Sequence, residues 1–287
     1  MLNRRQLLGG LAGVAGATVV GASSSGVRRR VHELLEPAPE PLHPVPVGAV
    51  GSLVEDTFAS AAMRRDVSFT TAYPGEVVAG LPVLLQLHGR GDDHRDAFRA
   101  HHLDAFLSDA VRRGVPPFAV VAPDGGDHSY WHRRAGGLDP LRMVVDELLP
   151  RLARKGLVVD RIAVGGWSMG GYGALLLAET LGRSRVAALV PDSPAVFRGW
   201  EDAAGGAFDS REDFDAHDVL ARADELAGIP TRVTCGTADP FLGQVRELLR
   251  RVPAAERQLE PGGHDSAWWQ HVAPAQLAFA GRALALG

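Results

Sequence analysis

The stretch that decides the fold reads Arg161-Ile162-Ala163-Val164-Gly165-Gly166-Trp167-Ser168-Met169-Gly170. An apolar strand pattern ends at the glycine pair, and a helical pattern runs on from residue 170 to 181. Between them stands G-x-S-x-G, which puts a serine on a strained strand-to-helix turn. Side chains two positions before and after Ser168 would collide there. A chance match in a chain with 34 glycines is the alternative, but the flanking strand and helix favour a nucleophilic serine.

The segments around this turn alternate between strand and helix patterns. Short apolar runs bounded by Gly or Pro suit strands buried on both faces of a parallel sheet. Residues 52–58 and 65–72 are expected to form an antiparallel start to the sheet. The alternation predicts an α/β fold with a mostly parallel central sheet and helices on both faces. The other predicted strands are 83–87, 118–122, 186–190, 231–235 and 256–260, with helical faces at 141–152 and 245–252.

A serine hydroxyl is a weak nucleophile that needs a base and an orienting acid. In folds with this turn the chain order is Ser, then Asp or Glu, then His. Asp239 follows the strand 231–235, and His264 stands in Gly262-Gly263-His264-Asp265 after the strand 256–260. Both are predicted at the carboxyl ends of strands, where α/β sheets place their sites. His271, the other histidine after Asp239, lies in a predicted helix.

Other acids compete with Asp239 for the orienting role. Asp192 ends the strand 186–190 and is the alternative acid. Asp265 is adjacent to the histidine and is expected to orient its loop. The remaining candidates lie in an irregular segment and are expected to be solvated charges: Asp209, Asp213, Asp215 and Asp218.

A tetrahedral intermediate needs preorganised donors for its negative oxygen. The expected donors are the backbone amides of Met169 and of Arg90, which lies in the glycine-containing loop after strand 83–87. The Arg90 side chain is alternatively solvated or paired with a neighbouring aspartate. A metal site at Asp92-Asp93-His94 is the competing interpretation of this loop. Because no second group of ligands accompanies it in the sequence, no metal is expected.

Tryptophans near the predicted catalytic residues are candidates for an apolar substrate pocket. Trp131, Trp167 and Trp268 are predicted to bind substrate, although some of the five tryptophans are expected to be core. The loop-rich segment 197–218 is where such folds place a small cap. It is too short for a full lid domain, so the site is expected to be open.

Residues 1–22 have the features of an export signal. Arg4 and Arg5 precede an apolar, glycine-rich run that ends in small residues suited to cleavage. The pattern resembles a twin-arginine signal, although the usual flanking residues are missing. An uncleaved anchor or a frayed helix is the alternative. After processing no stable membrane span is expected, since the run is short for a bilayer.

The rest of the chain divides into a linker and one catalytic domain. Five prolines between residues 37 and 46 favour an extended segment, so 23–50 is predicted to be a linker and 51–287 a domain. The net charge of −4 does not indicate nucleic-acid binding, which is associated with a basic surface. The single cysteine excludes an intrachain disulfide and a thiolate cluster. Oligomeric state is not predicted.

From about residue 51 to 280 the chain resembles the α/β-hydrolase esterases of the esterase D group, which includes enterochelin-esterase-like and mycolyltransferase-like enzymes. The resemblance implies an α/β-hydrolase fold with a small or no cap and hydrolysis of a small-molecule or lipid carboxylic ester without cofactor. Alternatives are acyl transfer at the cell envelope with the same triad, or a non-catalytic binding protein. Mycolyltransferases carry a glutamate where this chain has Asp239, which favours hydrolysis. The matching stretches are 57–60, 87–89, 130–132, 145–150, 166–170, 237–240, 263–265 and 268–269.

Overall fold

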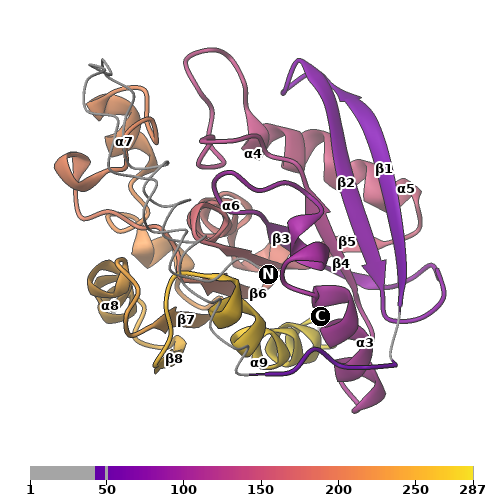
Figure 1. Ribbon diagram of the computed structural model, residues 1–287. Coiled ribbons are helices and arrows are strands. Elements are labelled where there is room, and N and C mark those ends of the chain that lie inside the picture. The colour runs from indigo at the N-terminus through magenta and orange to yellow at the C-terminus, as the bar shows by residue number, and fades with distance from the viewer. Residues whose placement is uncertain (1–42, 49–50, 287) are drawn as a thin grey trace, which may run out of the picture. The chain divides into compact units, whose positions relative to one another are not determined.

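The computed structural model describes residues 43–48 and 51–286, which belong to a compact unit spanning residues 40–287. Their strands form one sheet in the order β1-β2-β4-β3-β5-β6-β7-β8 (Figure 1). β1 and β2 pair antiparallel, as do β2 and β4, and every later pairing is parallel. The predicted α/β-hydrolase architecture, with a mostly parallel sheet and an antiparallel start, is confirmed.

Each strand predicted from the sequence forms, with bounds that differ by a few residues at most. Trp167 ends the strand before the glycine-flanked serine, as the turn motif requires. The strands are β1 (Ser52–Ser60), β2 (Arg65–Tyr73), β3 (Pro82–Leu87), β4 (Ala119–Pro123), β5 (Val158–Trp167), β6 (Val186–Asp192), β7 (Arg232–Gly236) and β8 (Glu256–Glu260).

The helical pattern at 141–152 forms a run with a π-helical centre. Pro150 has no N–H to donate and would crowd the carbonyl four residues earlier, and wider turns before it relieve that conflict. The helices are α2 (Asp96–Arg99), α3 (Leu103–Arg112), α4 (Pro140–Arg142), the π-helical η1 (Met143–Leu148), α5 (Leu149–Arg154), α6 (Met169–Arg185), the 3-10 turns η2 (Trp200–Asp202) and η3 (Ala223–Leu226), α7 (Arg211–His217), α8 (Leu242–Arg251) and α9 (Ser266–Leu284).

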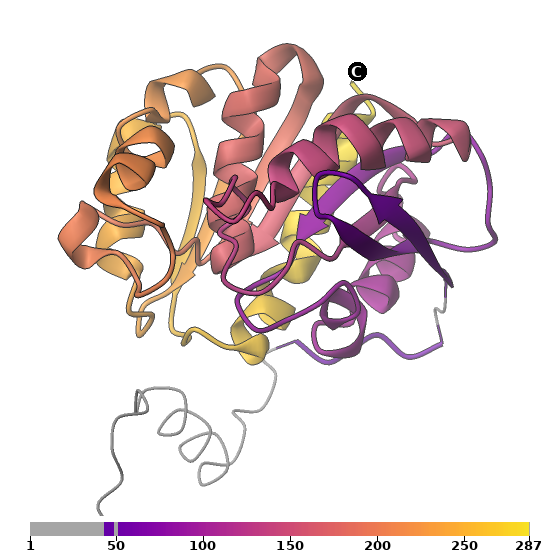
Figure 2. The same ribbon diagram turned by 90° about the horizontal axis from the view of Figure 1, so that it is seen from above.

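Helices cover both faces of the sheet, and the side-chain alternation of β3 shows the division. Val83 and Leu85 lie in one apolar core with residues of α5, α6 and α8. Leu84 points the other way, into a second core with residues of α3 and α9. Successive residues of a strand face opposite sides of the sheet, so one short apolar run contributes side chains to both cores. Both views show helices on the two sides of the sheet (Figures 1 and 2).

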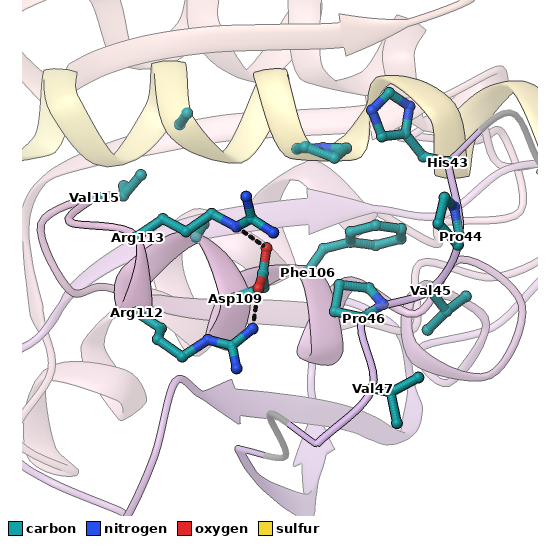
Figure 3. Close-up of a pocket in the computed structure, with 13 residues that line it drawn as sticks. His43, Pro44, Val45, Pro46, Val47, Phe106, Asp109, Arg112, Arg113 and Val115 are labelled. Carbon is teal, nitrogen blue, oxygen red and sulfur yellow. Dashed lines mark hydrogen bonds and ion pairs between the residues drawn. The ribbon is translucent and has the colours of Figure 1, made fainter.

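The predicted signal, residues 1–22, and most of the predicted linker lie outside the described residues. Residues 43–47 line a groove of about 600 Å³ with α3 and the middle of α9 (Figure 3). Asp109 in this groove pairs with both Arg112 and Arg113. Ser168, Asp239 and His264 are not among its lining residues. Within the described parts of the chain, no helix is long and apolar enough to cross a bilayer.

Candidate active site

Ser168 occupies the turn between β5 and α6 in a strained backbone conformation, with φ 54° and ψ −118°. Non-glycine residues rarely adopt positive φ, and such strain persists only where the surroundings hold it. Here the Ser168 N–H donates to the Asp192 carbonyl at 3.0 Å, and its carbonyl accepts from Ala195 N–H at 3.0 Å. The end of β6 therefore holds the serine in place.

The glycines of the motif are required by space. A Cβ on Gly166 would lie 2.4 Å from the Gly170 carbonyl carbon and oxygen. One on Gly170 would lie 2.0 Å from the Leu87 carbonyl oxygen, at the end of β3. These neighbours are backbone atoms that cannot move aside. The steric reason proposed for the motif therefore applies at both positions.

The structure brings the three predicted catalytic side chains together, with His264 between the other two and within hydrogen-bond distance of both. His264 Nε2 lies 2.8 Å from Ser168 Oγ, and its Nδ1 lies 2.7 Å from Asp239 Oδ2. The Asp239 carboxylate is buried and the Ser168 residue is partly buried, whereas the His264 side chain keeps 14% exposure. A base between a hydroxyl and a buried carboxylate can accept the hydroxyl proton and have its positive charge stabilised.

Two loops that follow neighbouring strands carry the acid and the base, and they contact each other directly. Ala238 N–H donates to the Gly262 carbonyl at 2.9 Å. A Cβ on Gly236 would lie 2.2 Å from the Gly262 carbonyl oxygen, so this approach needs a glycine. Phe241 N–H donates to Asp239 Oδ1 at 2.7 Å, which leaves Oδ2 for the histidine.

The competing acids have other partners. Asp192 is buried at the end of β6 and accepts from Thr234 Oγ1 and Gln276 Nε2, and burial raises its pKa to about 7. Asp265 caps α9 by accepting from Trp268 N–H at 3.0 Å, in line with its expected role in the loop. Asp209 pairs with Arg134. His271 lies within α9, as expected, and contacts Glu260.

The two predicted oxyanion donors belong to the turn that carries the serine and to the loop after β3. Met169 is the first residue of α6, and Arg90 lies exposed in the loop after β3. Trp167 Nε1 donates to Asp92 Oδ2 at 2.8 Å, which ties this loop to the end of β5. Asp92, Asp93 and His94 do not form a ligand group: His94 Nδ1 instead lies 2.8 Å from Thr70 Oγ1.

The predicted substrate contacts of three tryptophans need correction. Trp131, Trp167 and Trp268 are at most 1% exposed, so they offer no surface to a ligand. Trp131 fills space that Gly125 and Gly173 leave open, and its Nε1 donates to the His88 carbonyl. For Trp167 and Trp268, closeness in sequence to a predicted catalytic residue did not indicate on which side of the backbone the ring packs.

Two aromatic residues lie against the histidine: Trp269, which the sequence indicated by its closeness to His264, and Phe241, which it did not indicate. The ring centroid of Phe241 lies 5.2 Å from that of His264, and that of Trp269 lies 5.3 Å from it. His101 packs between Trp167 and Trp269, and burial lowers its pKa to about 3. The position of Phe241 two residues after Asp239 was the signal available for that residue.

Comparison with known proteins places this chain in a family. Residues 60–280 match the family described as "Putative esterase". No protein of curated function matches the chain. The fold resembles a ferulic acid esterase (TM-score 0.68, 19% identity, covering 83% of this chain and 100% of that one). It also resembles an S-formylglutathione hydrolase from Agrobacterium tumefaciens (TM-score 0.70, 16% identity, 83% and 97%). A third similar structure is a fluorophosphonate-binding serine hydrolase from Staphylococcus aureus (TM-score 0.67, 20% identity, 81% and 99%).

The fold and the family match define the class of protein. The chain belongs to this esterase family and has the α/β-hydrolase fold. It is a carboxylic-ester hydrolase, and the expected resemblance to esterase D-type enzymes is confirmed.

Proposed function

We propose that this protein is an exported serine esterase that cleaves small-molecule carboxylic esters through an acyl-enzyme on Ser168. One observation carries the proposal: an unbroken path runs from Ser168 Oγ through the His264 ring to the buried Asp239 carboxylate. A carboxylate at Nδ1 holds the ring proton there, which leaves the Nε2 lone pair facing the hydroxyl. The serine is thereby paired with a base that is ready to take its proton.

The proposed reaction has two halves. As Ser168 Oγ attacks the ester carbonyl carbon, its proton passes to His264 Nε2. The resulting imidazolium then protonates the leaving alcohol as the ester C–O bond breaks. In the second half a water molecule gives a proton to His264 Nε2 and attacks the carbonyl carbon of the acyl-enzyme. His264 then returns this proton to Ser168 Oγ as its bond to the acyl group breaks, and the carboxylic acid product leaves. The backbone amides of Met169 and Arg90 are the proposed donors to the oxyanion in both halves.

Replacing the nucleophile tests this proposal. The purified Ser168→Ala variant is assayed with nitrophenyl esters of increasing acyl length, which also ranks the substrates. We expect the turnover rate to fall by several orders of magnitude. The remaining rate enhancement over the reaction in water is expected to be about 10³–10⁴. Ser184→Ala, an exposed serine on the same helix, is the matched control and is expected to retain full turnover. Wild-type-like turnover in Ser168→Ala would overturn the assignment, provided that a fluorophosphonate probe also labels that variant.

We propose export by the twin-arginine route. The support is the pair Arg4-Arg5 ahead of a glycine-rich apolar run. Changing both arginines to lysine is expected to trap the precursor in the cytoplasm, as measured by cell fractionation. The processed protein is expected to begin near Ser23. Unchanged export of the Lys-Lys variant would argue for the general secretory route or against a signal.

A further inference from the structure

Three side chains with metal-ligand chemistry meet in a part of the fold that the triad does not use. His132 lies in the segment between β4 and α4, and Asp213 and His217 stand four residues apart on α7. Residues with that spacing share a helix face, so both α7 side chains point to the same place. One ligand atom from each of the three lies within 4.8 Å of the others.

The distances among these atoms suit a small divalent cation. Asp213 Oδ1 lies 3.0 Å from His217 Nδ1 and 3.5 Å from His132 Nδ1. With metal–ligand bonds of about 2.0–2.1 Å, neighbouring ligands of a tetrahedral zinc ion lie about 3.3 Å apart. Two edges of a tetrahedron are therefore already in place. Two imidazoles and one carboxylate form a ligand set that favours zinc and its divalent neighbours over calcium or magnesium.

The buried His132 ring points to a cation more directly. Its Nε2 lies 3.0 Å from the Ala207 carbonyl oxygen, and its Nδ1 lies 2.9 Å from the Arg133 carbonyl oxygen. A neutral imidazole has one N–H and can satisfy only one of these oxygens. With the proton on Nε2, the Nδ1 lone pair faces oxygen atoms and lacks a donor. Ligating histidines commonly donate their second ring N–H to a carbonyl, which is the contact that Nε2 makes.

We propose that His132, Asp213 and His217 bind one divalent transition-metal ion, with zinc as the best match to the ligands. His132 and His217 bind through Nδ1 and Asp213 through Oδ1. The His217 Nδ1, which lies 2.8 Å from the Asp213 carbonyl oxygen, can bind the ion only in the neutral tautomer with the proton on Nε2, so on binding the ring exchanges its proton with solvent from Nδ1 to Nε2. A water completes four ligands. The site shares no residue with the triad, so its test is independent of the proposed function.

The ion would fasten α7 to the segment after β4. The Phe208 ring stacks on His132 with centroids 5.1 Å apart, and it also contacts Phe197. Phe197 in turn contacts Phe241, whose ring lies on His264. Metal at this site would therefore stabilise the aromatic side of the catalytic centre while standing outside the reaction itself.

The test is a titration of the metal-stripped full-length protein with Zn²⁺ and, separately, with Co²⁺. We expect one saturable site by calorimetry and visible absorption bands when Co²⁺ binds. We also expect the Tm to rise by about 5–10 °C at a Zn²⁺ concentration 100-fold above Kd. His217→Gln is expected to weaken binding at least tenfold and to reduce the Tm rise at the same Zn²⁺ concentration to about half or less. His271→Gln, on α9 and outside the cluster, is the matched control and is expected to bind as the wild type does.

Two results would overturn the proposal. The first is absence of saturable binding to the wild type at pH 8, which would mean that a proton and not a metal joins His132 to Asp213. The second is equal binding by wild type and His217→Gln, which would mean that the metal binds adventitiously at the protein surface and not at this cluster. If His217→Gln fails to fold, the Co²⁺ spectrum of the wild type decides, because surface-bound Co²⁺ keeps the weak absorption of the hydrated ion.

Discussion

Two buried aspartates stand at the ends of neighbouring strands, and their surroundings give them different tasks. Asp239, after β7, receives the Phe241 N–H and the His264 ring. Asp192, at the end of β6, accepts from the neutral donors Thr234 and Gln276, and burial raises its pKa to about 7. A carboxylate beside an imidazole can stabilise positive charge, whereas one among neutral groups is stabilised by holding a proton.

The first prediction separates these residues by activity. Asp239→Asn is expected to lower kcat by about 10⁴, because an amide cannot hold the His264 ring in the required tautomer. Asp192→Asn is expected to leave kcat within a few-fold of wild type. Both are measured on the same nitrophenyl ester, with thermal unfolding as a check on folding. A larger loss in Asp192→Asn would move the catalytic acid to β6.

The second prediction concerns pH and stability. The Asp192 pKa is about 7 in the folded protein and near 3.8 when exposed, so between those pH values the folded state binds an extra proton. Its contribution to the free energy of unfolding therefore falls as pH rises across that window and is constant above it. Asn cannot ionise, so the Tm of Asp192→Asn relative to wild type is expected to be higher at pH 8 than at pH 5. An equal difference at both pH values would contradict the assignment of a protonated Asp192.

At the scale of elements, helix propensity and available space have opposite effects on the stability of an alanine at Gly170, in the turn from β5 into α6. Gly170 is the second residue of α6, where helix propensity favours alanine by up to about 1 kcal/mol. The absence of a Cβ on Gly170 also makes room for the end of β3. A Cβ there would lie 2.0 Å from the Leu87 carbonyl oxygen. The steric effect is larger, because the neighbour is a backbone carbonyl.

The third prediction tests which effect decides. Gly170→Ala is expected to destabilise the fold by about 1–3 kcal/mol, the usual cost of overpacking, measured by urea unfolding. Gly243→Ala is the matched control, since Gly243 is the second residue of α8. A Cβ there would meet the mobile end of the Arg198 side chain at 2.8 Å, so we expect no loss of stability. Stabilisation by Gly170→Ala would show that propensity prevails at the turn.

At the scale of the whole molecule, the proposed catalytic residues come together because parallel strands end at one edge of the sheet. Ser168 follows β5, the acid follows β7 and the histidine follows β8, and β5-β6-β7-β8 are successive strands of the sheet. The three residues are separated by up to 96 positions in sequence and yet lie within hydrogen-bond distance. The His264 side chain at this edge keeps 14% exposure, so water can reach it.

The fourth prediction follows from that exposure. Partition of an acyl-enzyme depends on which acceptor reaches it in attacking geometry, and closing lids are what exclude water. We expect free acid to be the main product when an ester is supplied together with glycerol or trehalose at millimolar concentration, as quantified by chromatography. If the transferred ester dominates, the protein acts as an acyltransferase, and its acceptor would be sought in the cell envelope.

Much of the fold, and the three residues that meet at the candidate site, were predictable from sequence because simple rules of pattern and order apply to them. Apolar runs bounded by Gly and Pro indicated the strands, and the backbone space around Ser168 admits only glycine at 166 and 170. Chain order and the ends of predicted strands then indicated Asp239 and His264. The strands and the turn glycines depend on a few adjacent residues, and Asp239 and His264 follow from chain order and strand ends, so the amino-acid sequence by itself determined these features.

Other features were decided only by tertiary structure, because they depend on which distant surfaces meet. β4 lies between β2 and β3, an order that no local pattern records. Trp131 is buried because Gly125 and Gly173, far apart in sequence, leave room for its ring. His132 meets the α7 ligands only when that helix packs against the segment after β4. Long-range packing selects such neighbours by shape and hydrogen bonding, and the sequence around each residue does not contain that information.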